Sequence, residues 1–214
     1  MREDRDIMLK RIRTALHGPP GAPAQVAPSI ARAYQVSTPT PAAVLLHQFV
    51  ERVAEYKAEV QTIAENALPT AIAAALAARK ALRLAVPADL PNDWLPPAVT
   101  ALRDQGQLTY QDLDGCDGVL TGCALGIAQT GTIILDHGPR QGRRALSLLP
   151  DYHLCVVWQS QIVGIVPEAI AQLATATTRP LTFISGPSAT SDIELNRVEG
   201  VHGPRTLHVL VVTA

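Results

Sequence analysis

The residues best suited to chemistry lie in a polar loop near the end of the sequence, between residues 186 and 205. Gly and Pro set tight backbone turns there, and the loop's hydroxyl and amide N–H groups can bind an oxyanion. The candidate ligand-binding residues of this closing loop are Gly186, Ser188, Thr190, Asp192, His202 and Arg205. Because apolar runs precede and follow the loop, we expect it to connect two strands.

A second candidate site is the turn Thr130-Gly131-Thr132, which comes directly before an apolar run at 133–135. Either a crowded backbone or the close approach of a ligand requires residues this small. If the turn faces the closing loop, the hydroxyls of Thr130 and Thr132 complete a small pocket for a carboxylate or a phosphate. The alternative is that both segments are tight turns that pack two crossover connections.

Charged and titratable side chains accompany both segments. Arg143, Arg144 and Arg205 can each pair with an anion through two parallel hydrogen bonds, or each can form a salt bridge within the protein. His202 either titrates near neutral pH or satisfies a backbone carbonyl. Asp192 either takes part in chemistry or caps a helix. The sequence leaves these alternatives open.

The composition limits the kinds of protein and partner. Of the 214 residues, 47% are hydrophobic but only 4% are aromatic, which is typical of parallel strands covered by helices. The net charge is −1 and the basic residues are spread along the chain, so we do not expect nucleic acid as a partner. The 3 cysteines include no C-x-x-C pair, which predicts small buried thiols rather than disulfides, a zinc site or an iron–sulfur cofactor.

Two parts are expected along the chain. Residues 1–41 comprise an amphipathic helix over 4–16 and a Pro-rich linker that is extended or disordered. The helix either is a docking arm or folds back onto the rest of the protein. The main domain, 42–214, opens with a helix that Thr40 caps and Pro41 begins. Because the sequence shows neither an apolar signal core nor a run long enough to span a membrane, we expect a cytoplasmic protein.

Within the main domain, strands alternate with helices. We expect strands near residues 59–63, 81–86, 107–113, 133–135, 152–158 and 181–185, and helices near 69–80, 97–105 and 167–177. This alternation predicts a layered α/β fold with a mostly parallel sheet and flanking helices. Ligands of such folds gather at the carboxyl ends of the strands, so we expect both candidate segments there.

Four motifs follow one another in the second half of the chain. They are Ile127-Ala-Gln-Thr-Gly-Thr-Ile133, Arg144-Ala-Leu-Ser-Leu-Leu-Pro150, Gly186-Pro-Ser-Ala-Thr-Ser-Asp-Ile-Glu194 and Gly200-Val-His-Gly-Pro-Arg205. In this order, and from about residue 40 to the C-terminus, the chain closely resembles the lactate utilisation protein C family, whose members contain the LUD domain. The resemblance implies a fold related to glucosamine-phosphate deaminase, ribose-phosphate isomerase and the CoA transferases.

The resemblance also implies a function. It suggests an accessory subunit of a bacterial three-protein system that oxidises L-lactate to pyruvate, with iron–sulfur proteins as partners and a small anion as ligand. The alternative is a stand-alone enzyme that acts on a sugar phosphate, an acyl-CoA or a folate-like substrate. Where the family usually has an acidic residue, this chain has Gln129. Glutamine can be neither a general base nor a nucleophile, so we expect Gln129 to position a ligand.

Overall fold

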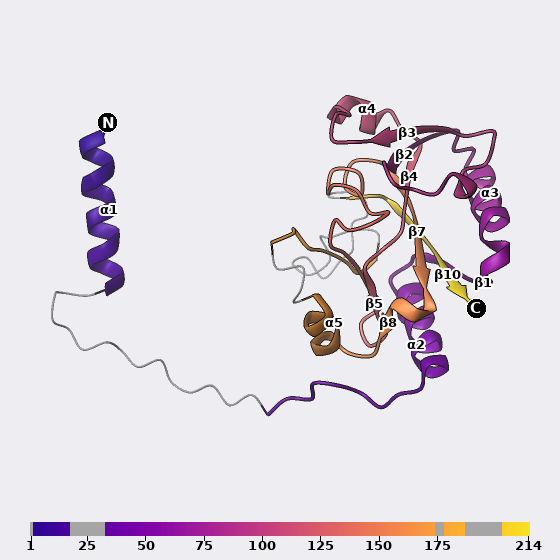
Figure 1. The fold of residues 1–214 in the computed structure, drawn as a ribbon, viewed down its shortest axis with the longest axis horizontal. Coiled ribbons are helices and arrows are strands. Elements are labelled where there is room, and N and C mark those ends of the chain that lie inside the picture. The colour runs from indigo at the N-terminus through magenta and orange to yellow at the C-terminus, as the bar shows by residue number, and fades with distance from the viewer. Residues whose placement is uncertain (1, 18–32, 174–177, 187–202) are drawn as a thin grey trace. The chain divides into compact units, whose positions relative to one another are not determined.

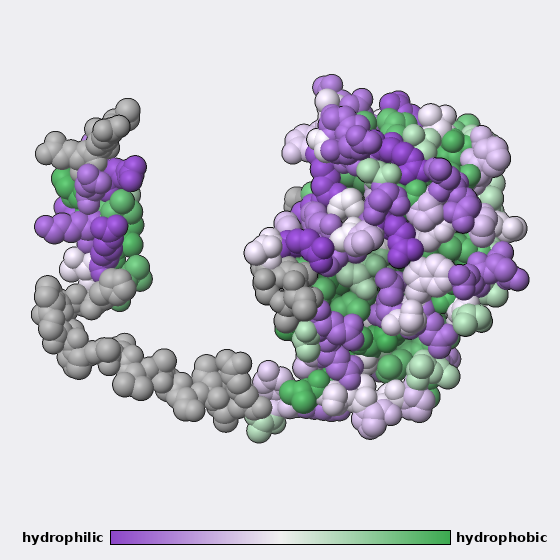
Figure 2. Space-filling view, in the orientation of Figure 1, coloured by the Kyte–Doolittle hydropathy of each residue, from purple (hydrophilic) through white to green (hydrophobic). Residues whose placement is uncertain are grey.

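The computed structural model describes residues 2–17, 33–173, 178–186 and 203–214. The chain divides into two compact units, Met1–Tyr34 and Gln35–Ala214. The first unit contains helix α1 (Arg2–His17), which confirms the helix predicted over 4–16. Figure 2 shows apolar residues at the surface of α1. The exposed apolar side chains of this helix are Ile7, Met8, Ile12 and Leu16.

A parallel sheet forms the centre of the second unit (Figure 1). In the described part of the chain it has six strands, in the order β1 (Glu59–Ala64), β10 (Thr206–Thr213), β7 (Tyr152–Trp158), β4 (Gly118–Thr121), β2 (Arg83–Pro87) and β3 (Thr100–Asp104). Every pairing is parallel. The central strands β7 and β4 are apolar and buried along almost their whole length, as parallel strands covered on both faces must be. The predicted α/β class is therefore confirmed.

A second, smaller sheet lies against the first and was not predicted. Among the described residues its order is β8 (Ile162–Val163), β5 (Leu125–Ile127), β6 (Thr132–Leu135) and β9 (Thr182–Ile184). Strands β5 and β6 form an antiparallel hairpin, β8 adds to β5 in parallel, and β9 adds to β6 antiparallel. The strands predicted near 133–135 and 181–185 exist, but they belong to this sheet.

Helices and the second sheet cover the two faces of the parallel sheet. The helices are α2 (Ala42–Glu55), α3 (Leu68–Ala78), α4 (Tyr110–Asp114) and α5 (Val166–Leu173). Side chains of β7 alternate between the faces, because successive residues of a strand point in opposite directions. Leu154 and Val156 pack with α3, whereas Cys155 and Val157 pack with Phe49 of α2 and with the second sheet. Figure 1 shows α3 and α2 on different sides of the sheet.

Two predicted elements are wrong. The helix predicted over 97–105 is strand β3, which extends the sheet by pairing with β2; this tertiary pairing overrides the local pattern. The strand predicted over 107–113 is instead mostly helix α4, which begins with a capping box. The Thr109 side chain accepts from the Asp112 amide (3.1 Å), and the Asp112 carboxylate accepts from the Thr109 amide (2.9 Å). The remaining predicted strands and helices of the main domain agree within a few residues over the described ranges.

The start of α2 also differs from the prediction. The N-cap is Pro41 and no side chain caps the helix; the Thr40 hydroxyl hydrogen-bonds the Thr38 hydroxyl instead (2.6 Å). The segment before α2 is tied to the turn before α5 by Glu168, whose carboxylate accepts from the amides of Thr38 (2.6 Å) and Gly164 (2.7 Å). Burial opposes ionisation of Glu168, but these backbone donors lower its pKa overall.

Candidate functional site

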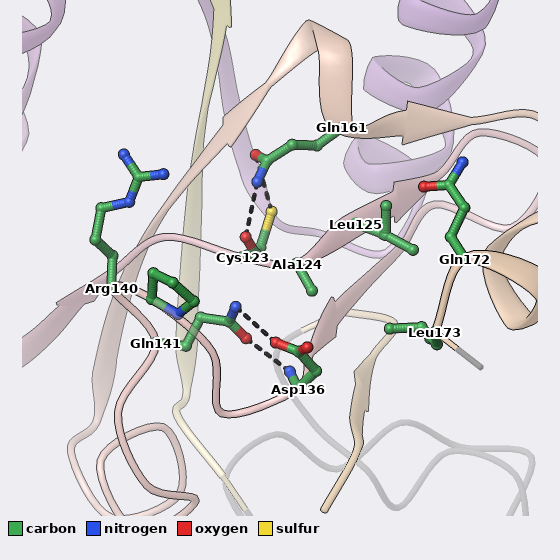
Figure 3. A pocket seen from close by; sticks show the side chains of 10 residues that line it. Cys123, Ala124, Leu125, Asp136, Arg140, Gln141, Gln161, Gln172 and Leu173 are labelled. Carbon is green, nitrogen blue, oxygen red and sulfur yellow. Dashed lines mark hydrogen bonds between the residues drawn. The ribbon is translucent and has the colours of Figure 1, made fainter. Parts of the chain in front are cut away.

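A cavity of about 280 Å³ lies beyond the carboxyl end of β4, against the second sheet (Figure 3). Its lining residues are Cys123, Ala124, Leu125, Asp136, Pro139, Arg140, Gln141, Gln161, Gln172 and Leu173. They come from the segment after β4, the loop after β6, the turn after β7 and helix α5. Because parallel α/β proteins bind ligands at the carboxyl ends of their strands, this cavity is the candidate site.

A reciprocal pair of side chains closes the loop after β6. Asp136 Oδ1 accepts from Gln141 Nε2 (2.8 Å) and from the Gly138 amide (3.0 Å), and Gln141 Oε1 accepts from the Asp136 amide (2.6 Å). Figure 3 shows the two side chains facing each other. Arg179 forms an ion pair with Asp136. Arg179 therefore balances the charge of the Asp136 carboxylate, and the hydrogen bonds of this carboxylate hold the wall of the cavity in place.

The same loop contains unusual backbone. His137 and Arg140 have φ values of 58° and 62°, a left-handed conformation that costs a residue with a side chain about 1–2 kcal/mol. The Arg140 backbone is fixed by donation to Asp89 Oδ2 (2.8 Å) and by acceptance from the Gly122 amide (2.8 Å). Its guanidinium lies 5.9 Å from the centre of the Trp94 ring. Such strain is found preferentially at functional sites, and Arg140 is the only cationic residue among those described in the cavity lining.

Gln161 joins the ends of the two central strands. Its Nε2 donates to the Cys123 carbonyl (2.8 Å), and its Oε1 accepts from the Trp158 amide (2.8 Å) and from the Cys123 thiol (3.5 Å). Figure 3 shows this contact at the edge of the cavity. The Cys123 side chain is thus held against Gln161 at the wall of the cavity.

A second thiol lies behind the first. Cys155 of β7 pairs in register with Thr121 of β4, and its thiol donates to the Gly122 carbonyl (3.8 Å). The neighbouring Cys123 thiol, with further help from His153 and Thr121 and against the effect of burial, holds the pKa of Cys155 well below its ordinary value. The neighbouring Cys155 and burial raise the pKa of Cys123.

Sequence reasoning predicted buried thiols, which is confirmed, but it found no role for them or for His153. The predicted strand over 152–158 already places His153 and Cys155 on one face, since side chains alternate along a strand. What the sequence could not supply was the pairing of β4 with β7, which brings Cys123 to them.

The predicted turn at Thr130-Gly131-Thr132 contacts Ser185, the residue directly before the closing loop. Thr132 Oγ1 hydrogen-bonds both Thr130 Oγ1 (2.7 Å) and Ser185 Oγ (2.8 Å). Gly131, however, has φ +60°, and a Cβ there would lie 2.7 Å from the carbonyl carbon of Arg52 in α2. Packing against α2 therefore accounts for this glycine. The turn adjoins the second sheet, so the expectation that it lies at the carboxyl edge of the parallel sheet is wrong.

The arginines separate into different roles. Arg143 Nε lies 2.6 Å from Oδ2 of the buried Asp104, which makes it a structural ion pair. Arg205 is exposed and lies 3.5 Å from Asp151, so the predicted salt-bridge alternative holds for it in this structure. Arg144 is exposed on the loop that leads to β7.

The other predicted residues divide between described and undescribed segments. Gln129 is exposed. Its backbone N–H donates to the Gly164 carbonyl (3.0 Å), and this bond prolongs the pairing of β5 with β8. Gly186 is buried and has φ +87°. Outside the described residues lie Ser188, Thr190, Asp192 and His202.

Among the residues that the structure describes, no group of three or more His, Cys, Asp or Glu side chains is arranged to hold a metal ion. None of the helices that the structure describes is both long and apolar enough to cross a membrane.

These features define an α/β protein in which a small cavity at the carboxyl end of a parallel sheet is walled by a second sheet. The LUD domain matches residues 46–212, and the chain belongs to the LUD domain family. The resemblance seen in the four motifs is thereby confirmed.

Similar proteins agree with this assignment. Lactate utilization protein C of Deinococcus radiodurans is 49% identical over 181 residues, which cover 84% of each chain. Lactate utilization protein C of Halalkalibacterium halodurans is 33% identical over 114 residues, 50% of this chain and 49% of that one. A crystal structure of a DUF162 family protein from Deinococcus radiodurans superposes with a TM-score of 0.72 at 47% identity and covers 81% of this chain and 99% of that one.

Proposed function

We propose that this chain is an accessory subunit of a bacterial system that oxidises L-lactate to pyruvate, with iron–sulfur proteins as its partners. The observation that supports this most is the 49% identity to a lactate utilization protein C across 84% of both chains. The parallel α/β sheet is also what kinship with glucosamine-phosphate deaminase, ribose-phosphate isomerase and the CoA transferases requires, and we include that kinship in the proposal.

The proposed ligand is a small anion, and the proposed place is the cavity beyond β4. Its volume of about 280 Å³ suits a molecule of a few heavy atoms, since one water takes about 30 Å³ in the liquid. Arg140 supplies a cation, and Gln161 and Gln172 supply amide groups. The hydroxyls of Thr130 and Thr132 already hydrogen-bond each other, which favours the cavity over the turn.

Partner binding and growth test the role. The tagged chain should retain the iron–sulfur proteins encoded beside it, and deletion should slow growth on L-lactate but not on pyruvate, the product of the proposed pathway. Re-expression of the chain should restore growth. If no iron–sulfur protein is retained and the deletion strain grows normally on L-lactate, the proposed role is refuted.

Thermal unfolding tests the ligand. L-lactate or pyruvate at a hundred times its dissociation constant should stabilise the protein by about 2.7 kcal/mol, which raises the melting temperature by roughly 5 to 10 °C for a domain of this size. Arg140→Gln should remove the shift while the backbone bonds of Arg140 remain. Arg144→Gln, on the same loop but exposed, is the matched control. A shift that survives Arg140→Gln but disappears in Arg144→Gln, Arg205→Gln or Thr130→Val would place the ligand at those residues instead.

The alternative function is a stand-alone enzyme. It is favoured by the position of the cavity at the carboxyl end of the sheet, where α/β enzymes place their active sites. The same thermal screen should then respond to a sugar phosphate, an acyl-CoA or a folate and not to L-lactate or pyruvate.

A further inference from the structure

Four buried side chains that can donate, accept or carry a proton lie on one face of the central strands. Thr121 ends β4 and pairs in register with Cys155, and His153 precedes Cys155 by two residues on β7. Because side chains alternate along a strand, all three point to the same face, where Cys123 joins them. Thr121, His153 and Cys155 are each 0% exposed, and Cys123 is 5% exposed.

A hydrogen-bonded path connects the imidazole to the inner sulfur. His153 Nε2 lies 2.8 Å from Thr121 Oγ1, which donates to Cys155 Sγ at 3.9 Å. Since the threonine hydroxyl has a single hydrogen, donation to the sulfur leaves its lone pairs to accept from Nε2–H of His153. The other ring nitrogen, Nδ1, is buried without a partner among the described residues.

The Cys155 sulfur has partners in both of its protonation states. As a thiolate it accepts from the hydroxyl of Thr121 at 3.9 Å. As a thiol it donates to the Gly122 carbonyl at 3.8 Å. The pKa of Cys155 is lowered and that of Cys123 is raised, so Cys155 is the more acidic of the two thiols.

Access to the pair runs through the outer sulfur. Cys123 lines the cavity of about 280 Å³, and Cys155 does not. A cavity of that size accommodates a small molecule. Reactive cysteines need thiolate character together with partial access, and here Cys155 supplies the first and Cys123 the second.

We propose that Cys123 and Cys155 form an oxidisable dithiol site whose substrate is a small hydroperoxide that enters the cavity. Cys155 takes the proton of Cys123, and the Cys123 thiolate attacks the terminal oxygen of the hydroperoxide. An S–O bond forms, the O–O bond breaks, and the leaving alkoxide takes a proton from water. The Cys155 sulfur then releases its proton and attacks the Cys123 sulfur. An S–S bond forms, the S–O bond breaks, and the leaving hydroxide takes that proton to become water.

The electrons balance in this sequence, because the two sulfurs lose two electrons and the O–O bond gains them.

The disulfide would also change the cavity. Gly122, between Thr121 and Cys123, is bonded through its amide to the Arg140 carbonyl at 2.8 Å, so movement of the Cys123 backbone is transmitted to the loop that carries Arg140. This goes beyond the proposed role in lactate oxidation and is read out by thiol chemistry rather than by ligand binding.

Thiol mapping of the full chain tests the proposal. The reduced protein is exposed to stoichiometric hydrogen peroxide, unfolded, alkylated and analysed by peptide mass. Cys123 and Cys155 should be joined and lose two hydrogens together, while Cys116 remains alkylated. Cys116 is an internal control, because burial raises its pKa and its thiol donates to the Asp112 carbonyl. Three alkylated cysteines after exposure, or a disulfide that involves Cys116, would overturn the proposal.

The pH dependence and variants test the two sulfurs separately. Below its pKa of about 8.5, an ordinary thiol reacts about tenfold faster for each unit by which the pH rises, whereas the native pair should react at nearly the same rate at pH 7 and pH 8. Thr121→Val should restore a steep dependence with the same peptide map. Cys155→Ser, which lacks the sulfur that takes the Cys123 proton, should react more slowly and stop at a sulfenic acid on Cys123. Cys116→Ser should change nothing. An ordinary pH dependence in the native protein, or unchanged kinetics in Thr121→Val, would contradict the relay.

A larger oxidant tests the substrate class. Glutathione disulfide is too large for the cavity, so a mixed disulfide with Cys123 should form at least tenfold more slowly than the internal disulfide forms with hydrogen peroxide at the same concentration. Equal rates would show that the site is open to bulky disulfides and that a small hydroperoxide is not its preferred substrate.

Discussion

Replacing Gly131 by alanine should separate the two reasons that a small residue can occupy this turn. The glycine has φ +60°, and an added Cβ would lie 2.7 Å, 2.8 Å and 2.9 Å from the carbonyl carbon, Cβ and carbonyl oxygen of Arg52. Ordinary carbon–carbon contacts are about 3.5–4.0 Å. The turn and α2 must therefore move apart by close to an ångström, or the turn must change its conformation.

The expected loss of stability has two parts. The left-handed backbone costs alanine about 1–2 kcal/mol, and overpacking against a backbone that cannot rotate away costs about 1–3 kcal/mol. We therefore expect Gly131→Ala to lower the free energy of unfolding by about 2–5 kcal/mol. For a domain of this size the melting temperature should fall by roughly 5 to 15 °C.

Urea unfolding followed by circular dichroism measures this loss, with Gly106→Ala as the matched control. Gly106 also has a positive φ, +99°, but nothing lies within 4 Å of its added Cβ. The control should therefore show only the backbone cost. If Gly131→Ala is no more destabilised than Gly106→Ala at an equal dependence on urea, the close approach of α2 does not explain the glycine, and a ligand-binding role for the turn regains its force.

Other buried and bridging charges give further predictions. Glu168→Gln should lose about 1–2 kcal/mol at pH 7, because the charge that three backbone amides stabilise is gone. Since the pKa of Glu168 is lowered by folding, its contribution is complete above the unfolded value of about 4.3 and disappears as the pH falls through the folded value. Urea unfolding at pH 7 and pH 3 should therefore show the variant and parent converging; an equal gap at both would rule this out. Arg143→Ala should lower the free energy of unfolding, measured in urea, by about 3 kcal/mol or more, because it leaves the buried Asp104 carboxylate without its ion-pair partner. Arg205→Ala, which breaks an exposed pair, should cost less than about 1 kcal/mol, and equal losses in the two variants would contradict the distinction.

Much of the parallel core could be predicted because its strands carry their own signal. The run at 152–158 is apolar, short and bounded by turn residues, and it coincides with β7. The errors over 97–105 and 107–113 have different causes. Strand β3 is an edge strand whose pairing with β2 has no local signature, whereas the Thr109–Asp112 capping box of α4 was readable but was outweighed by the apolar residues around it.

The candidate site was harder to predict. The sequence predicts that Thr132 faces the closing loop, most of which lies outside the described residues; the structure shows Thr132 hydrogen-bonded to Ser185, which directly precedes that loop. The sequence could not show that Gly131 packs against α2. Arg52 is 79 positions away along the chain, and only the packed helix brings the Arg52 backbone to the turn.

By itself the sequence determined the α/β class, the burial of the thiols and membership of the LUD domain family. These follow from local patterns of apolar residues and from short ordered motifs, which do not depend on which strands become neighbours. Only the tertiary structure decided that the chain builds a second sheet, that the cavity lies beyond β4, and that Cys123 and Cys155 belong to one core cluster. The physical reason is that strand order and register are set by packing between distant segments, and neither leaves a trace in the residues on either side.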